Sequence, residues 1–114
     1  MKIVEKVTIS ELKELSKPMM NDIVKADVDI VKKIVIIDAE YHSDMESYLI
    51  EKGSNGDDLW GINFHPHEYG TENFVEFDSM INLKPRLGNN TRYVEDEKIR
   101  KEIIDIVNGV IEDA

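Results

Sequence analysis

The fold of this chain depends on residues 23–41, which read IVKADVDIVKKIVIIDAEY. In the first half of this stretch the apolar residues stand at every second position: Val24, Ala26, Val28 and Ile30. Such alternation, together with many β-branched residues, is typical of β-strands. We therefore predict a β-hairpin with strands at 23–31 and 34–42 and a turn at Lys32-Lys33. The same stretch also permits a helix, whose apolar positions would be Ile23, Val24, Val28, Val31, Ile34 and Val35.

Two short helices flank this hairpin, and residues 2–7 before them read as a first strand. The first helix begins with the capping box Thr8-Ile9-Ser10-Glu11 and ends before Pro18, because proline disfavours helical geometry in the residue that precedes it. The second begins with the capping box Ser43-Asp44-Met45-Glu46 and ends at Gly53, which predicts a helix at 44–52.

The second half of the chain adds two strands and a long helix. Alternation predicts strands at 59–64 and 74–83, with Trp60 in the core, and helical spacing predicts a helix at 96–112 capped by Asp96. The order is then β-α-β-β-α-β-β-α. It indicates a single α+β domain over residues 1–114, with a mainly antiparallel sheet of about 4–5 strands and helices on one face.

Acidic residues outnumber basic ones. The 114 residues include 24 Asp and Glu against 14 Lys and Arg, for a net charge of −10. Nucleic-acid binders usually carry the opposite balance, and the same excess disfavours anionic membrane surfaces. We therefore expect neither nucleic acid nor a membrane as a partner, which leaves a second copy of the chain or another protein.

The sequence contains no cysteine, which excludes disulfides, cysteine-based zinc sites and thiol catalysis. No apolar run is long enough to span a membrane, and the N-terminus lacks the pattern of a signal peptide. We therefore expect a cytoplasmic protein. The abundance of Ile, Lys and Asn, whose codons are A/T-rich, indicates a prokaryotic source.

Polar side chains gather on one face of the predicted sheet. They are Asp38, Glu40, His42, Asn63, Glu76, Asp78 and Asn82. Because oxygen ligands suit Mg²⁺, Ca²⁺ or Mn²⁺, one hypothesis is a divalent cation held by His42, Glu40 and Asp78. The alternative is an ordinary hydrated face, since antiparallel sheets commonly expose one side to water.

His42 stands directly before the second capping box. A functional interpretation pairs His42 with Asp44 or Glu46 as catalytic acid and base. Capping of the helix explains the two acids but leaves His42 unexplained. The segment His65-Pro66-His67 lies in a loop without fixed ligand geometry, and we interpret it as surface rather than as a metal site.

The loop after the last predicted strand holds two of the three arginines, Arg86 and Arg92. The planar guanidinium group suits a carboxylate or a phosphate. We predict that one of these arginines folds back toward His42 or Asp78 and forms a mixed polar cleft. The candidate ligand-binding residues are then Asn63, Asp78, Asn82, Arg86, Asn89 and Arg92. The alternative is that both arginines pair with surface acids such as Glu95.

Several segments match a known family in their order along the chain. They are His42-x-Asp44-x-Glu46, Gly53-Ser54, Leu59-Trp60-Gly61-Ile62-Asn63, Phe77-Asp78-Ser79-Met80-Ile81-Asn82-Leu83-Lys84-Pro85, Asn89 and Val94-Glu95-Asp96. In these segments the chain resembles a family of small prokaryotic proteins known only as a domain of unknown function. The resemblance implies a stand-alone domain and carries no activity.

No motif assigns an activity. The sequence contains no glycine-rich nucleotide loop, no Walker loop and no common hydrolase motif. The function is therefore unknown from the sequence. The leading hypothesis is a stand-alone binding or interaction domain, and the alternative is a divalent-metal-assisted hydrolase or related enzyme centred on His42.

Overall fold

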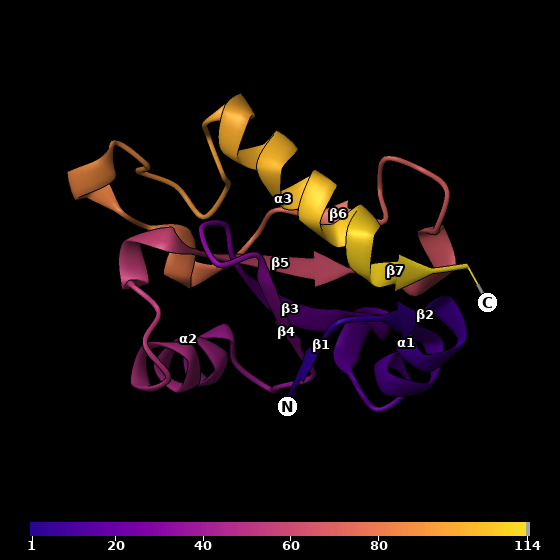
Figure 1. Cartoon of the computed structure of the whole chain (residues 1–114). Coiled ribbons are helices and arrows are strands. Elements are labelled where there is room, and N and C mark those ends of the chain that lie inside the picture. Colours follow the sequence, from indigo (N-terminus) through magenta and orange to yellow (C-terminus); the bar gives the residue numbers. More distant parts are fainter. Residues whose placement is uncertain (114) are drawn as a thin grey trace.

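Five strands form one antiparallel sheet in the computed structural model, which describes residues 1–113 (Figure 1). Their order across the sheet is β1-β4-β3-β5-β6. These strands are β1 (Lys2–Val4), β3 (Val24–Asp29), β4 (Ile34–Ile37), β5 (Leu59–Phe64) and β6 (Val75–Glu76). The helices are α1 (Ile9–Ser16), α2 (His42–Glu51) and α3 (Glu97–Val110). The predicted α+β class and the long helix near the C-terminus are confirmed, but α3 ends at Val110 rather than at residue 112, because Ile111–Glu112 forms the short strand β7.

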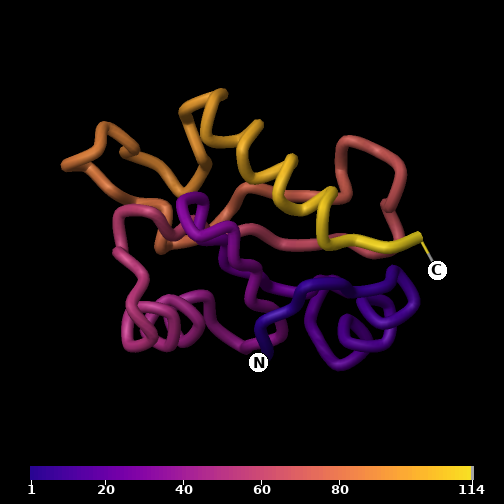
Figure 2. Tube along the Cα trace, in the orientation of Figure 1, coloured from indigo at the N-terminus to yellow at the C-terminus, as the bar shows by residue number. Residues whose placement is uncertain are grey.

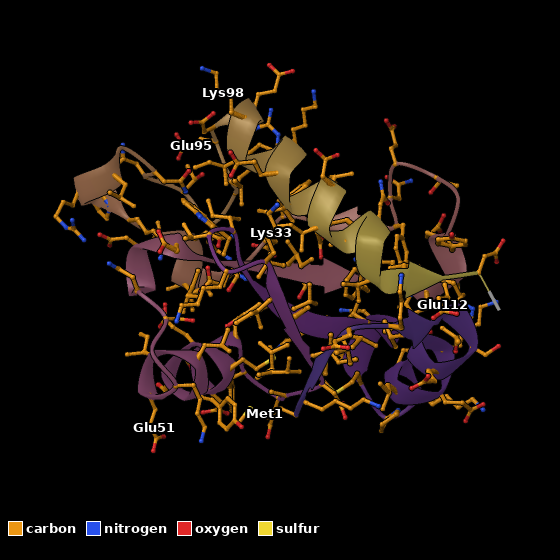
Figure 3. The ribbon with its side chains drawn as sticks, in the orientation of Figure 1. Met1, Lys33, Glu51, Glu95, Lys98 and Glu112 are labelled. Atoms are coloured by element: carbon orange, nitrogen blue, oxygen red, sulfur yellow. The ribbon has the colours of Figure 1, made fainter. Side chains whose placement is uncertain are left out.

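The hairpin predicted for residues 23–41 is confirmed as the antiparallel pair β3–β4, and the helical alternative is wrong. Its turn is built by Asp29, whose Oδ1 accepts hydrogen bonds from the backbone N–H groups of Val31 (2.9 Å) and Lys32 (2.8 Å). Lys33, which is labelled in Figure 3, completes the turn with a φ of +57°. The hydrogen bonds accepted by the Asp29 carboxylate thus stabilise a turn for which Lys32 and Lys33 have no intrinsic preference.

The strand predicted for residues 34–42 ends early, at Ile37. Asp38 has a φ of +71°, a left-handed conformation that stops the strand and turns the chain toward α2. Asp38, Glu40 and His42 are therefore not strand residues, and His42 is instead the first residue of α2.

Helices cover both faces of the sheet, which corrects the prediction of helices on one face. The larger core lies under α1 and α3, where Leu12 and Ile103 pack with Val28 of β3 and Ile62 of β5. Helix α2 packs on the opposite face, where its Met45 and Leu49 meet Ile36 and Leu59. Figure 1 shows α2 and α3 separated by the strands.

The helix ends follow the predicted caps in part. Thr8 Oγ1 accepts a hydrogen bond from Glu11 N (3.0 Å), and Asp96 Oδ1 accepts one from Lys98 N (2.8 Å), so both predicted N-caps are confirmed. The capping box at Ser43 is wrong, because α2 begins at His42 and its N-cap, Tyr41, makes no side-chain capping bond. Its C-terminal cap at Gly53 is confirmed, with a φ of +108°.

The strand predicted for residues 74–83 is wrong over most of its length. Only Val75–Glu76 pairs with β5, and Met80–Asn82 forms a short 3₁₀ helix. Its start is stabilised by Ser79, whose Oγ accepts a hydrogen bond from Ile81 N (3.2 Å). We call residues 77–83, which leave the sheet, the irregular segment. This segment forms one side of the candidate functional site.

The predicted first strand, residues 2–7, is divided between two sheets. β1 joins the main sheet, whereas β2 (Val7–Thr8) pairs in parallel with β7 (Ile111–Glu112). Figure 2 shows the resulting arrangement, in which the end of the chain runs beside its N-terminal segment. Within the described part of the chain, no helix has the length and apolarity needed to cross a membrane.

Candidate functional site

A polar cleft of about 590 Å³ opens on the α2 side of the sheet. Its polar walls come from distant parts of the chain: Lys25, His42, Asn63, Glu76, Asp78 and Arg92. We call this site the polar cleft. It brings together four residues that were predicted as site candidates, namely His42, Asn63, Asp78 and Arg92.

The floor of the polar cleft follows from strand register. β3 places Lys25 opposite Asn63 of β5, and β5 places Asn63 opposite Glu76 of β6. Directly opposed residues in neighbouring antiparallel strands project to the same side of a sheet. The three side chains therefore form one row across three strands.

Asn82 connects the irregular segment to β5. Its Oδ1 accepts a hydrogen bond from Gly61 N (2.8 Å), and its Nδ2 donates to Gly61 O (3.0 Å) and to Arg92 O (2.9 Å). β6 pairs only with Asn63 and Phe64, so it does not reach Gly61. The amide of Asn82 thus takes the place of the strand that would otherwise have paired there.

Gly61 is required by the close approach of this segment. A Cβ atom at Gly61 would lie 2.5 Å from Ser79 Cβ and 3.0 Å from His42 Cδ2. Any larger residue would therefore push apart the two segments that carry His42 and Asp78.

Asn89 completes the support of the arginine-bearing loop. Its Nδ2 donates to the carbonyls of Asn82 (2.8 Å) and Tyr93 (2.7 Å), and its Oδ1 accepts from Glu95 N (2.8 Å). Asn82 and Asn89 are buried, and their amide groups are engaged by the backbone. We therefore assign both a structural role rather than the predicted ligand-binding one.

His42 lies at the start of α2 with one ring nitrogen bound to β5. Its Nε2 is 2.9 Å from Ile62 O, and because a carbonyl only accepts, this nitrogen carries the proton. Burial lowers the pKa of His42, and the charges of Lys25 and Arg92 lower it further, against the opposing effects of the Ile62 carbonyl and Asp78. At neutral pH the ring is therefore uncharged, and Nδ1 keeps a lone pair that can accept a hydrogen bond.

Arg92 folds back to Asp78, as predicted for one of the two arginines. Its Nε donates to Asp78 Oδ1 (2.7 Å), and its side chain is 53 % exposed. Arg86 instead pairs with Asp57 outside the polar cleft. The alternative, that both arginines pair with surface acids such as Glu95, therefore holds for Arg86. The acid is Asp57 rather than Glu95, whose carboxylate accepts hydrogen bonds from Asn90 N and Thr91 Oγ1.

The remaining candidates lie outside the polar cleft. Asp44 and Glu40 are exposed, and neither they nor Glu46 contribute to its lining. Glu40 touches this region through its backbone carbonyl, which accepts a hydrogen bond from Lys25 Nζ (2.6 Å). Among residues 1–113, no three His, Asp or Glu side chains are arranged to hold a metal ion. The geometry therefore offers no support for the predicted divalent cation.

The sequence does not mark Lys25 as a site residue, nor does it single out Asp27, which lies on the same face of β3 but does not line the polar cleft. Asp27 is fully buried in β3 on the α2 side, and neither carboxylate oxygen has a hydrogen-bond partner among residues 1–113. Burial, and secondarily the charge of Glu46, raise the pKa of Asp27 to about 9 despite the opposing charge of Lys84, so the carboxyl is protonated at neutral pH. Alternation placed both residues on one strand face, but it did not show that α2 and the irregular segment cover that face.

The family model for a protein of unknown function, DUF5674, matches residues 1–110. The chain belongs to the DUF5674 family. This confirms the resemblance to a domain of unknown function. No curated protein and no solved structure matches the chain. Membership in DUF5674 carries no activity, so the function of this chain has to be argued from the polar cleft itself.

Proposed function

We propose that this protein is a small binding domain whose polar cleft receives the carboxylate or phosphate group of a small polar molecule. The observation that carries the proposal is the position of Arg92. The Nε of Arg92 donates a hydrogen bond to Asp78. Among residues 1–113, no group accepts a hydrogen bond from the terminal Nη atoms of Arg92. A guanidinium group held in this way presents its remaining donors in a fixed plane, which suits a two-oxygen anion.

Two other features of the polar cleft favour an anion. Lys25 adds a second positive charge to the wall, in a molecule whose net charge is −10. Ser43, in the first turn of α2, also lines the cleft, and the N-terminus of α2 has no side-chain cap. The first N–H groups of a helix lack intrahelical partners and carry a partial positive charge, so they attract anions.

A titration with inorganic phosphate tests this proposal. We expect the backbone amide signals of His42 and Ser43 and the Nε signal of Arg92 to shift in a ¹H–¹⁵N NMR spectrum, whereas chloride at equal ionic strength leaves them in place. A hydrogen bond to a charged group contributes about 1.5–3 kcal/mol. Arg92→Gln should therefore weaken phosphate binding by about tenfold or more.

Arg86→Gln is the matched control, because it also removes an exposed arginine that pairs with an aspartate. It should leave phosphate binding unchanged. If both variants weaken phosphate equally, the effect is one of net charge, and the proposed site is wrong. Nothing in the structure favours the alternative of a metal-assisted hydrolase, since no three His, Asp or Glu side chains are arranged to hold a metal ion among residues 1–113. Association with a second copy or with another protein stays a prediction.

A further inference from the structure

A second hollow, of about 750 Å³, adjoins the polar cleft. The two share His65, Glu76 and Asp78, which form the wall between them. Glu68 and Glu72 also line the second hollow, and no lysine or arginine does. We call it the acidic hollow. Four carboxylates line the acidic hollow, those of Glu68, Glu72, Glu76 and Asp78. In the polar cleft, by contrast, the positive charges of Lys25 and Arg92 offset the negative charges of Glu76 and Asp78.

An acceptor without a donor lies beside this shared wall, on the side of the polar cleft. Asn63 is 5 % exposed and lines the polar cleft, and its Nδ2 donates to Glu76 Oε1 (2.9 Å) and Asp78 O (3.0 Å). These two bonds fix the orientation of the amide, because only the NH₂ group can donate to them. Its Oδ1 is buried and has no hydrogen-bond partner among residues 1–113. A buried acceptor without a donor is rare and costs about 1–3 kcal/mol.

The polar groups on the two sides of this wall are complementary to opposite charges. On one side, Arg92, Lys25 and the N-terminus of α2 offer donors. On the other side, Glu76, Asp78 and the glutamates of the acidic hollow offer acceptors. An anion alone would satisfy the first set. Glu76 already accepts hydrogen bonds from Asn63 Nδ2 (2.9 Å) and His65 Nε2 (3.1 Å), and Asp78 accepts one from Arg92 Nε (2.7 Å). The carboxylates of Glu68 and Glu72 accept none among residues 1–113, so the acidic hollow would keep an excess of negative charge.

We infer that the molecule received by the polar cleft is a zwitterion, whose anionic group meets Arg92 and whose amine meets Glu76 and Asp78 at the edge of the acidic hollow. This inference rests on the proposed function and specifies its ligand class. An ammonium group supplies several N–H donors, which match the carboxylates of Glu76 and Asp78 and those of the acidic hollow. Phe77 and Tyr93 line the acidic hollow and provide an apolar surface for the carbon chain of such a molecule.

Titration with simple amino acids tests the inference. The probes are β-alanine, γ-aminobutyrate and ε-aminocaproate, which differ in the separation of their two charges, with butyrate and butylamine as single-charge comparators. We expect at least one amino acid to bind about tenfold or more tightly than both comparators, the ratio that corresponds to 1.4 kcal/mol. NMR shifts should then include Tyr93 and Glu72 in addition to His42 and Ser43.

A carboxylate variant sharpens the test. Glu76→Gln keeps the size of the side chain and its acceptor for Asn63 but removes the charge, so it should abolish the advantage of the amino acid over butyrate. Glu102→Gln, on the exposed face of α3, is the matched control and should change nothing.

The outcomes separate the two proposals. If phosphate binds at Arg92 but every amino acid binds no better than butyrate, the zwitterion is wrong and the proposed function stands. If neither phosphate nor any amino acid binds, both are wrong. If butylamine binds as tightly as the amino acids, the anionic half contributes nothing and the zwitterion is wrong, whereas the proposed function still depends on whether phosphate binds at Arg92.

Discussion

The two faces of the five-stranded sheet are stabilised in different ways. Under α1 and α3, apolar side chains such as Val28, Ile62 and Phe64 pack into one continuous core. Under α2 and the irregular segment, the same strands present Asp27, Asn63 and other polar groups that are also buried. The apolar face depends on volume and area, whereas the polar face depends on specific hydrogen-bond partners.

This difference explains where a site can form. A close-packed apolar face has no room and no polar groups for a ligand. The polar face is covered partly by loops, and Asn82 there replaces a strand and leaves a cleft beside it. The candidate site therefore lies where the sheet stops being regular.

The largest expected effect is on the apolar face. Phe64 is fully buried and stacks on Phe74 with ring centres 5.3 Å apart. Phe64→Ala should lower the free energy of unfolding by about 3–5 kcal/mol, because it removes buried area and leaves a cavity. Urea denaturation followed by circular dichroism measures this. Leu87→Ala, at an exposed position, should cost about 0.5 kcal/mol or less, and an equal loss in both variants would contradict this account of the core.

The next largest effect is expected for Asn82→Ala. The variant leaves the N–H and C=O of Gly61 without their partner, and each buried unpaired group costs about 1–3 kcal/mol. The carbonyl of Arg92 loses one hydrogen bond but keeps the one from Ser79 N (3.1 Å). The loop that carries Arg92 should also loosen, which amide hydrogen exchange at Arg92 and Tyr93 would detect. Asn90→Ala is the control, since Asn90 is exposed. Equal stability of the two variants would show that Asn82 does not replace a strand.

Asp27→Asn should change the pH dependence of stability. The folded-state pKa of Asp27, about 9, lies above the ordinary value of 3.8. The raised pKa therefore contributes to the stability of the fold, fully below about pH 4, and this contribution is lost as the pH rises toward 9. In that window the wild type should lose up to about 1.4 kcal/mol per pH unit, and the asparagine variant should lack this loss.

The comparison is made by denaturant unfolding of both proteins across this pH window. His42, whose pKa is lowered, destabilises the fold as the pH falls below 6.5, but it is present in both proteins and cancels in their difference. Parallel stability curves for the two proteins would contradict a protonated Asp27.

The smallest effect on stability is expected from the arginines. Arg86 and Arg92 are 74 % and 53 % exposed, and exposed ion pairs contribute less than about 1 kcal/mol. Arg86→Gln and Arg92→Gln should each shift the melting temperature only slightly, while only the second weakens phosphate binding. If Arg92→Gln unfolds the protein, Arg92 is structural and the polar cleft loses its anion-binding residue.

Local patterns in the sequence were sufficient for the regular elements. The alternation from Val24 to Ile30 predicted β3, and the spacing of apolar residues after Asp96 predicted α3. Thr8, Gly53 and Asp96 marked helix ends correctly. These features depend on residues within a few positions of one another, which is why the sequence by itself determined them.

The site could be predicted only in part. One of Arg86 and Arg92 was expected to fold back toward His42 or Asp78, because a planar guanidinium group suits a carboxylate, and Arg92 does bind Asp78. Lys25 was missed, because its place beside Asn63 depends on the register between β3 and β5, which the sequence does not display.

The course of residues 74–83 was decided by tertiary structure. Their apolar and polar residues alternate as in a strand. However, Ser79 packs against Gly61, and the side chain of Asn82 forms hydrogen bonds with the backbone of Gly61, so the chain leaves the sheet after Glu76. Likewise, the capping box at Ser43 has strong local chemistry, but α2 begins two residues earlier than predicted, at His42, which bonds to Ile62. In both places hydrogen bonds between residues about twenty positions apart outweigh the local preference, because a buried backbone group must find a partner wherever the fold provides one.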